Sequence, residues 1–163
     1  MNEDEIPLDT SEYKVYGIRW IQLLVFFFAT LSNGIQGMTF VPIVNQTSEF
    51  YQITTSEVNL LSVVFLFLYV VGTAVSIWLS RRFSLRMVII IGSILNLGVF
   101  IRLFSLINRY EGYASLLIGQ LFPAVAAPFF LNCPALIAAR WFSPSQRDIA
   151  TSIGSMANPL GKI

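Results

Sequence analysis

The chain has 163 residues, of which 55% are hydrophobic and 12% are charged, and its mean hydropathy is +0.69. Soluble domains carry about 25% charged residues, so this composition excludes an ordinary soluble domain and predicts a membrane protein. The net charge of +1 gives no reason to expect a nucleic acid partner. With no histidine and the single cysteine Cys133, neither a metal site nor a cofactor is expected.

Residues 1–18 are polar and mainly acidic, which is typical of a disordered cytosolic tail. Residues 19–163 are expected to form a transmembrane helical region. Because lipid offers the backbone no hydrogen-bond partners, apolar runs of about 20 residues predict helices that cross the hydrocarbon layer. Four such runs and a fifth that is too short to span occur at residues 20–44, 58–79, 87–107, 113–139 and 149–163. The predicted fold class is an all-α membrane protein with about four and a half transmembrane helices.

Basic residues near the ends of the runs predict the orientation. If the N-terminus faces the cytosol, Arg102 and Arg109 lie toward the outside and most other basic residues lie inside. The inside set is Lys14, Arg19, Arg81, Arg82, Arg86, Arg140 and Arg147. A multi-pass membrane protein with a cytosolic N-terminus is therefore expected, in the plasma membrane or an internal membrane.

Neutral polar residues inside the first run are candidates for contact with a solute. Asn33 and Gln36 lie three positions apart and so share one helical face. Gly34 and Gly37 beside them allow a ligand or a neighbouring helix to approach the backbone closely. The pair is expected either to line a substrate path or to join helices by hydrogen bonds.

Gln120 in the fourth run and Asn158 in the fifth are further substrate-binding candidates. The fourth run also contains Pro123, Pro128 and Pro134. Each internal proline deletes one backbone hydrogen bond, so the fourth helix is predicted to be bent and irregular.

The four complete runs contain no acidic residue and no lysine. Transport would then be facilitative, or its coupling group would lie elsewhere, because proton relays use intramembrane acids or histidines. Without titratable pairs in the runs, an enzyme is not expected. Arg102 is expected to reach the outer interface, with a gate or a clamp for an anionic substrate as the alternative.

The link between the second and third runs, residues 78–86, is short and strongly basic. It resembles the signature loop between spans two and three of the major facilitator superfamily. That loop has an aspartate, a basic pair, a glycine and a final basic residue. Arg81 stands at the aspartate position, Ser84 at the glycine position and Arg86 at the last one. The resemblance implies a gating role for Arg81, Arg82 and Arg86, and ordinary anchoring of a cytosolic loop is the alternative.

A wider resemblance covers residues 13–161. In order and spacing, several short segments are similar to solute carrier family 49, the feline leukaemia virus subgroup C receptor-related proteins. These segments are residues 13–20, 33–36, 78–96, 119–120, 134–150 and 158–161. The Asn-Pro-Leu-Gly form of the last segment and the Tyr-x-Val-Tyr start resemble the orphan third member of that family rather than its receptors.

This resemblance implies about twelve helices in two six-helix halves, with substrate held between the halves near the midplane. Family receptors are linked to choline, ethanolamine and haem. A tryptophan and a glutamine at two choline-contacting positions of the family are replaced here by Gly37 and Ala127. Losing the cation–π face and the amide argues against choline. Gln36, Gln120 and Asn158 carry over as substrate-binding positions.

The expected function is transmembrane transport of a small organic solute by alternating access, with this chain as the N-terminal part of a facilitative transporter. Its expected partners are the lipid bilayer, the small-molecule substrate and the remaining helices of the full-length transporter. The alternative is a truncated, non-transporting membrane protein that binds a helical membrane partner.

Overall fold

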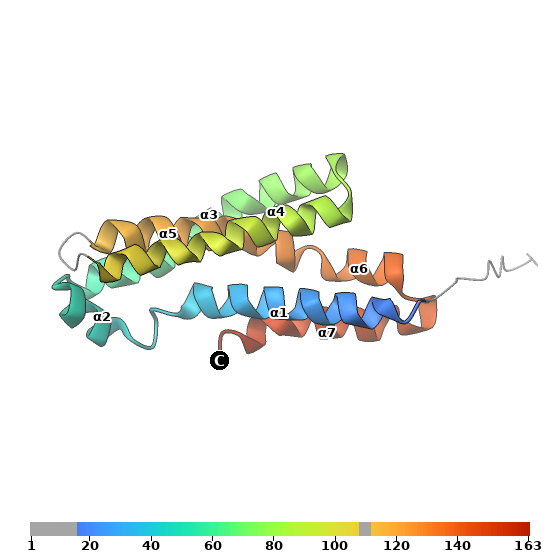
Figure 1. Cartoon of the computed structure of the whole chain (residues 1–163), viewed down its shortest axis with the longest axis horizontal. Coiled ribbons are helices and arrows are strands. Elements are labelled where there is room, and N and C mark those ends of the chain that lie inside the picture. The colour runs from blue at the N-terminus through green and yellow to red at the C-terminus, as the bar shows by residue number, and fades with distance from the viewer. Residues whose placement is uncertain (1–15, 108–111) are drawn as a thin grey trace, which may run out of the picture.

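The computed structural model describes residues 16–107 and 112–163. Residues 1–15 of the expected tail, including Lys14, lie outside the described residues, and so does Arg109. The described residues contain helices and no strand, and Figure 1 shows the long helices packed side by side in an elongated bundle. The elements are α1 (Ile18–Met38), α2 (Val44–Tyr51), α3 (Thr55–Arg82), α4 (Leu85–Leu97), η1 (Gly98–Leu106), α5 (Gly112–Leu131), α6 (Pro134–Trp141), η2 (Pro144–Gln146) and α7 (Arg147–Leu160).

Four helical segments within the described residues are long and apolar enough to cross a membrane. They are Ile18–Met38, Thr55–Arg82, Leu85–Leu106 (α4 continued by η1) and Gly112–Leu131. Because only helices and closed barrels satisfy the backbone in lipid, these segments confirm the predicted all-α membrane fold class. Helix α7 has 14 residues, or about 21 Å of length, which is less than the hydrocarbon thickness.

Helices α1, α4 and α7 begin, and α3 and α6 end, toward the same end of the bundle (Figure 1). Arginines occur at all five of these helix ends, and we call this the basic end. It comprises Arg19, Arg81, Arg82, Arg86, Arg140 and Arg147. Successive long helices therefore run antiparallel, as short connections between spans require.

The expected first span over residues 20–44 is wrong at its end, because α1 stops at Met38. Pro42 has no backbone N–H and keeps the residue before it out of helical geometry, so the chain turns between Thr39 and Ile43. The chain resumes as the separate short helix α2, in which the Tyr51 hydroxyl hydrogen-bonds the Ser105 hydroxyl at 2.7 Å. That bond holds α2 against η1.

The expected fourth span over residues 113–139 is also interrupted. Helix α5 ends at Leu131 and α6 begins at Pro134, so the helix breaks at Asn132 and Cys133. Pro134 occupies the first turn of α6, the position where a missing N–H removes no intrahelical bond. The prediction of an irregular fourth helix is thus confirmed, with the break at the third proline while the other two prolines stay inside α5.

The expected third span over residues 87–107 begins as the α-helix α4 and continues as the tighter 3₁₀ helix η1. Nine residues is long for this helix type, whose runs seldom exceed about four. The tight winding coincides with close contact to α5. A Cβ at Gly119 would lie 2.6 Å from Cγ of Arg102, and one at Gly98 would lie 2.4 Å from Cβ of Phe122. Glycines therefore let α5 and this span approach each other.

Helix α5 is the most buried long helix and contacts α1, α3, α4 and η1. In the larger hydrophobic core, small and aromatic residues of α5 pack against α1, α4, α6 and α7. That core includes Leu23, Phe26, Val88, Ala126, Phe129, Phe130, Ile137 and Ala150. A smaller core near α2 combines Phe40, Tyr51, Val58, Leu61 and Leu116.

Candidate functional site

A cavity of about 490 Å³ lies among α1, α3, α5 and α7, and we call it the Asn158 cavity. Its size falls within the range of about 300–1,000 Å³ that small-molecule sites occupy. Its lining is mainly apolar, with a few polar groups at Ser62, Tyr69, Asn158 and Lys162. An apolar cavity with a few polar groups is the usual form of a small-molecule site.

The α3 wall of this cavity is aromatic. Phe65 and Tyr69 are four residues apart and therefore lie one turn apart on the same face. A Cβ at Gly37 would lie 3.0 Å from Cζ of Phe65, so the Phe65 ring fills the space beside α1. Gly37 and Ala127, which replace the two choline-contacting positions of the similar family, both line this cavity.

Asn158 is 3% exposed and lines the cavity from α7. Its position is set by close packing of α7 on α1, because a Cβ at Gly34 would lie 2.5 Å from the Asn158 carbonyl oxygen. The structure therefore brings this candidate to the cavity, and its role in binding a solute stays a prediction.

Asn33 is fully buried among α1, α4 and α5 rather than among the residues that line the cavity. Its Nδ2 donates to Oδ1 of Asn96 at 2.8 Å and to the carbonyl oxygen of Pro123 at 2.9 Å. These contacts match the interpretation in which Asn33 joins helices. A contact between Asn33 and a solute stays a prediction.

Gln36 and Gln120 are brought together by Arg102. The Arg102 guanidinium donates from Nη2 to the side-chain Oε1 of Gln120 and to the backbone oxygen of Gln36, the latter at 3.3 Å. The same guanidinium lies 5.2 Å from the ring centroid of Phe40. Arg102 thus turns into the bundle instead of reaching the outer interface, and the interface interpretation is wrong.

Two amide atoms in this cluster have no hydrogen-bond partner among the described residues. They are Oε1 of Gln36 and Nε2 of Gln120, both buried. Nε2 of Gln36 donates to the Ser32 hydroxyl at 3.1 Å, so each amide is half satisfied. The sequence pattern indicates the two glutamines and Arg102 as separate candidates. An arginine within an apolar run is the signal that connects the three, because a buried charge needs acceptors.

The three candidate gating arginines lie at the basic end. The guanidinium of Arg82 lies 5.8 Å from the Trp78 ring centroid, and that of Arg86 lies 5.9 Å from the Trp141 ring centroid. Arg81 is exposed. Cation–π contacts at a helix boundary fit interfacial anchoring as well as gating, and the gating role stays a prediction.

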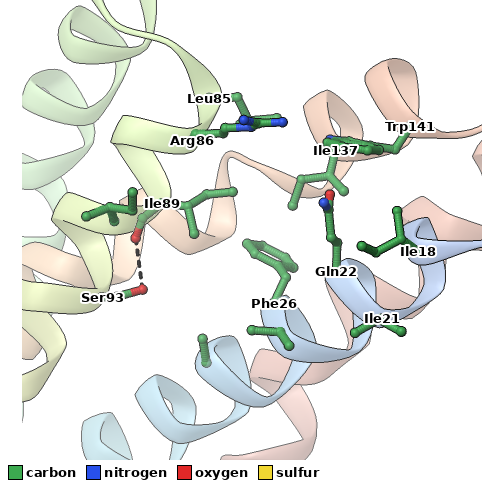
Figure 2. A pocket seen from close by; sticks show the side chains of 13 residues that line it. Ile18, Ile21, Gln22, Phe26, Leu85, Arg86, Ile89, Ser93, Ile137 and Trp141 are labelled. Atoms are coloured by element: carbon green, nitrogen blue, oxygen red, sulfur yellow. Dashed lines mark hydrogen bonds between the residues drawn. The ribbon is translucent and has the colours of Figure 1, made fainter. Parts of the chain in front are cut away.

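A second hollow, the α1–α4 groove, has a volume of about 420 Å³ and is lined by α1, α4 and α6. Figure 2 shows Phe26, Ile89 and Ile137 around this groove, with Arg86 and Trp141 along one side. The Ser93 hydroxyl in it donates to its own helix, to the carbonyl of Ile89 at 2.9 Å. The groove therefore offers an apolar surface with few free polar groups.

The family described as Major Facilitator Superfamily matches residues 23–163. "Solute carrier family 49 member A3" of Xenopus tropicalis is 33% identical over 161 residues, covering 94% of this chain and 33% of that protein. "Choline/ethanolamine transporter FLVCR2" of Homo sapiens is 32% identical, covering 95% of this chain and 29% of that protein. The chain spans about a third of the length of these curated relatives.

Proposed function

The chain belongs to the Major Facilitator Superfamily, and on that premise we propose that it is the N-terminal part of a transporter for a small organic solute. The solute would bind in the Asn158 cavity and cross the membrane by alternating access. The basic end would face the cytosol, which places the N-terminus there and follows the positive-inside rule.

The observation that carries this proposal is the Asn158 cavity itself. Four helices from distant parts of the sequence meet around it, and its size suits a small molecule. In such a transporter each half contributes one wall of a path that the other half completes, so a cavity open on one side of this part of the N-terminal half fits that role. The break between α5 and α6 adds a joint that a rigid helix lacks.

Arg81, Arg82 and Arg86 would act in this proposal at the cytosolic side, where their side chains approach the ends of α3, α4 and α6. Asn33, Gln36 and Gln120 would act through the packing of α1 against α4 and α5, and Asn158 would touch the solute. This division follows from which of the four amides lines the cavity.

A pair of introduced cysteines on α3 tests whether water and solutes reach the cavity. In a Cys133→Ala background, Ser62→Cys places a thiol in the cavity. Phe67→Cys places one on a residue that is 67% exposed and absent from the cavity lining, so it faces lipid. The chain is reconstituted in phosphatidylcholine nanodiscs, and the rate of reaction with a membrane-impermeant charged thiol reagent is measured.

We expect the Ser62→Cys thiol to react about 100-fold faster than the Phe67→Cys thiol, because thiolates form in water and not in hydrocarbon. Equal slow rates at both positions would mean that the cavity is closed to water, and the transport proposal would fail.

The α1–α4 groove favours the alternative function, a membrane protein that binds a helical partner. The groove has a volume of about 420 Å³ and an apolar lining, so a further apolar helix could pack on it. An Ile90→Cys substitution in the Cys133→Ala background tests this alternative, because Ile90 is 50% exposed and lines the groove. Rapid cross-linking from that position to another membrane protein, together with a slow Ser62→Cys reaction, would support the alternative over transport.

A further inference from the structure

Lys162 is an exposed residue two positions after the end of α7. Helix α7 starts from the basic end and runs for 14 residues, about 21 Å, before it reaches Leu160. The next residue, Gly161, packs on the second half of α1, because a Cβ there would lie 2.4 Å from the Leu31 carbonyl oxygen and 2.9 Å from the Ile35 nitrogen. Lys162 therefore lies beside the second half of α1, and it shares the cavity lining with Met38, the last residue of α1.

Lys162 is also the charged side chain of the Asn158 cavity. No carboxylate of the described residues lines this cavity. The acidic side chains of the described residues lie on α2 (Glu49), in the first turn of α3 (Glu57) and in the first turn of α7 (Asp148). An ammonium that shares a cavity with no acidic side chain attracts an anion.

Asn158 and Lys162 form one polar corner of the cavity. Asn158 lies in the last turn of α7 and Lys162 two residues after its end, and both line the cavity. The Asn158 amide has hydrogens that it can donate, and the Lys162 ammonium has three. The opposite wall is apolar and aromatic, with Phe65, Leu66 and Tyr69 on α3. The cavity thus combines a corner of donors with a wall that suits an apolar body.

We propose that the Asn158 cavity binds an organic anion, with its carboxylate or phosphate group at Lys162 and Asn158 and its apolar body against Phe65 and Tyr69. This inference rests on the proposed function, because it names the substrate class of the same site. It separates this chain from the relatives named as choline/ethanolamine transporters, whose named solutes are cations. A cation in this cavity would meet the like charge of Lys162.

The anion has two chemical sources, a soluble organic acid or the headgroup of an anionic lipid. In both, an anionic oxygen group is joined to an apolar body, and the cavity recognises that shared feature. The membrane composition separates them, since phosphatidylcholine carries no net charge and phosphatidylglycerol is anionic.

The test uses three probes with one apolar body and different charge: 4-phenylbutyrate, 4-phenylbutan-1-ol and 4-phenylbutylamine. Each probe is added to the full chain carrying Ser62→Cys and Cys133→Ala in phosphatidylcholine nanodiscs. As the probe concentration is raised, we measure how far the probe slows the reaction of the introduced thiol with a neutral thiol reagent. The experiment is repeated with Lys162→Ala and with Lys162→Arg, which keeps the charge, and again in nanodiscs that contain phosphatidylglycerol.

We expect 4-phenylbutyrate to protect at about tenfold lower concentration than the alcohol or the amine, because the alcohol lacks a charge to pair with the Lys162 ammonium and the amine meets a like charge. Lys162→Ala should remove this preference and Lys162→Arg should keep it. Protection by phosphatidylglycerol alone, lost in Lys162→Ala, supports the anion site with a lipid as its source.

Two outcomes overturn the inference. In the first, the amine protects as well as the acid; in the second, Lys162→Ala leaves the preference for the acid unchanged. In either, protection by any probe still supports a solute cavity, so the proposed function stands. If no probe and no lipid protects the introduced thiol, the cavity is not a solute site and both proposals fail.

Discussion

Gly34 of α1 lies directly against the backbone of Asn158 in α7. A Cβ at position 34 would lie 2.5 Å from the Asn158 carbonyl oxygen, which is too close for any real contact with a backbone atom. This contact, together with that of Gly161 against Leu31 and Ile35, holds α7 close to α1 and so positions Asn158 beside its cavity. Small residues at helix interfaces have this role in membranes, where close packing drives association.

The first prediction concerns this contact. Gly34→Ala should force α1 and α7 apart and lower the free energy of unfolding by about 1–3 kcal/mol, the usual cost of overpacking. Thermal unfolding in detergent, followed by circular dichroism, measures the loss. Gly17→Ala is the matched control, because a Cβ there meets nothing within 4 Å. Equal melting temperatures for the two variants would show that α7 is not held by this contact.

The second prediction concerns the amide pair of Asn33 and Asn96, whose side chains bond at 2.8 Å across 63 positions of the chain. A double-mutant cycle with Asn33→Ala and Asn96→Ala should give a coupling free energy of about 0.6–1.7 kcal/mol, the range found for hydrogen bonds between membrane helices. Ser93→Ala serves as the control partner, because its hydroxyl bonds within its own helix. A coupling between Asn33 and Asn96 no larger than that between Asn33 and Ser93 would argue against a bridging bond.

The third prediction concerns Arg102. Arg102→Leu should lower the free energy of unfolding by about 1.5–3 kcal/mol, because it removes hydrogen bonds to a charged group and leaves the Gln120 amide unpaired. Adding Gln120→Leu should then lower the free energy of unfolding little further, because the Gln120 amide has already lost its hydrogen-bond partner. Chemical denaturation of both variants checks this. Fully additive losses would mean that Arg102 and Gln120 do not act as a pair.

The fourth prediction concerns α2. Tyr51→Phe removes the hydrogen bond to Ser105 and should weaken the docking of α2 by about 1 kcal/mol, with little effect on the long helices. Hydrogen exchange resolved by mass spectrometry should quicken in residues 44–51 and stay unchanged in α5. The exposed Gln46→Ala on the same helix is the control. Equal acceleration throughout the bundle would show instead that the whole fold depends on this bond.

Sequence reasoning on the helices succeeded where a run of apolar residues is the physical cause. The apolar runs predict spans because lipid leaves the backbone no other partner, and α3 and α5 begin within three residues of their expected starts. Hydropathy alone did not locate the helix ends at Pro42 and Pro134, where apolar character continues but the helix does not, although the prolines predicted an irregular fourth helix. Hydropathy measures how well a segment dissolves in lipid, whereas a proline acts through one missing N–H and one steric clash, and its effect depends on what else satisfies the backbone.

The sequence by itself therefore determined the class of the protein, the number of its apolar helices and the polar residues among them. Only the tertiary structure decided which of those residues meet. It placed Asn33 between helices, turned Arg102 inward to Gln120, and brought Lys162 and Asn158 to a cavity opposite Phe65 and Tyr69. The reason is that hydrophobic partition depends on composition along one segment, whereas a hydrogen bond or a cavity depends on the relative positions of several helices. Those positions are set by glycines and small residues whose effect appears only when the helices are packed.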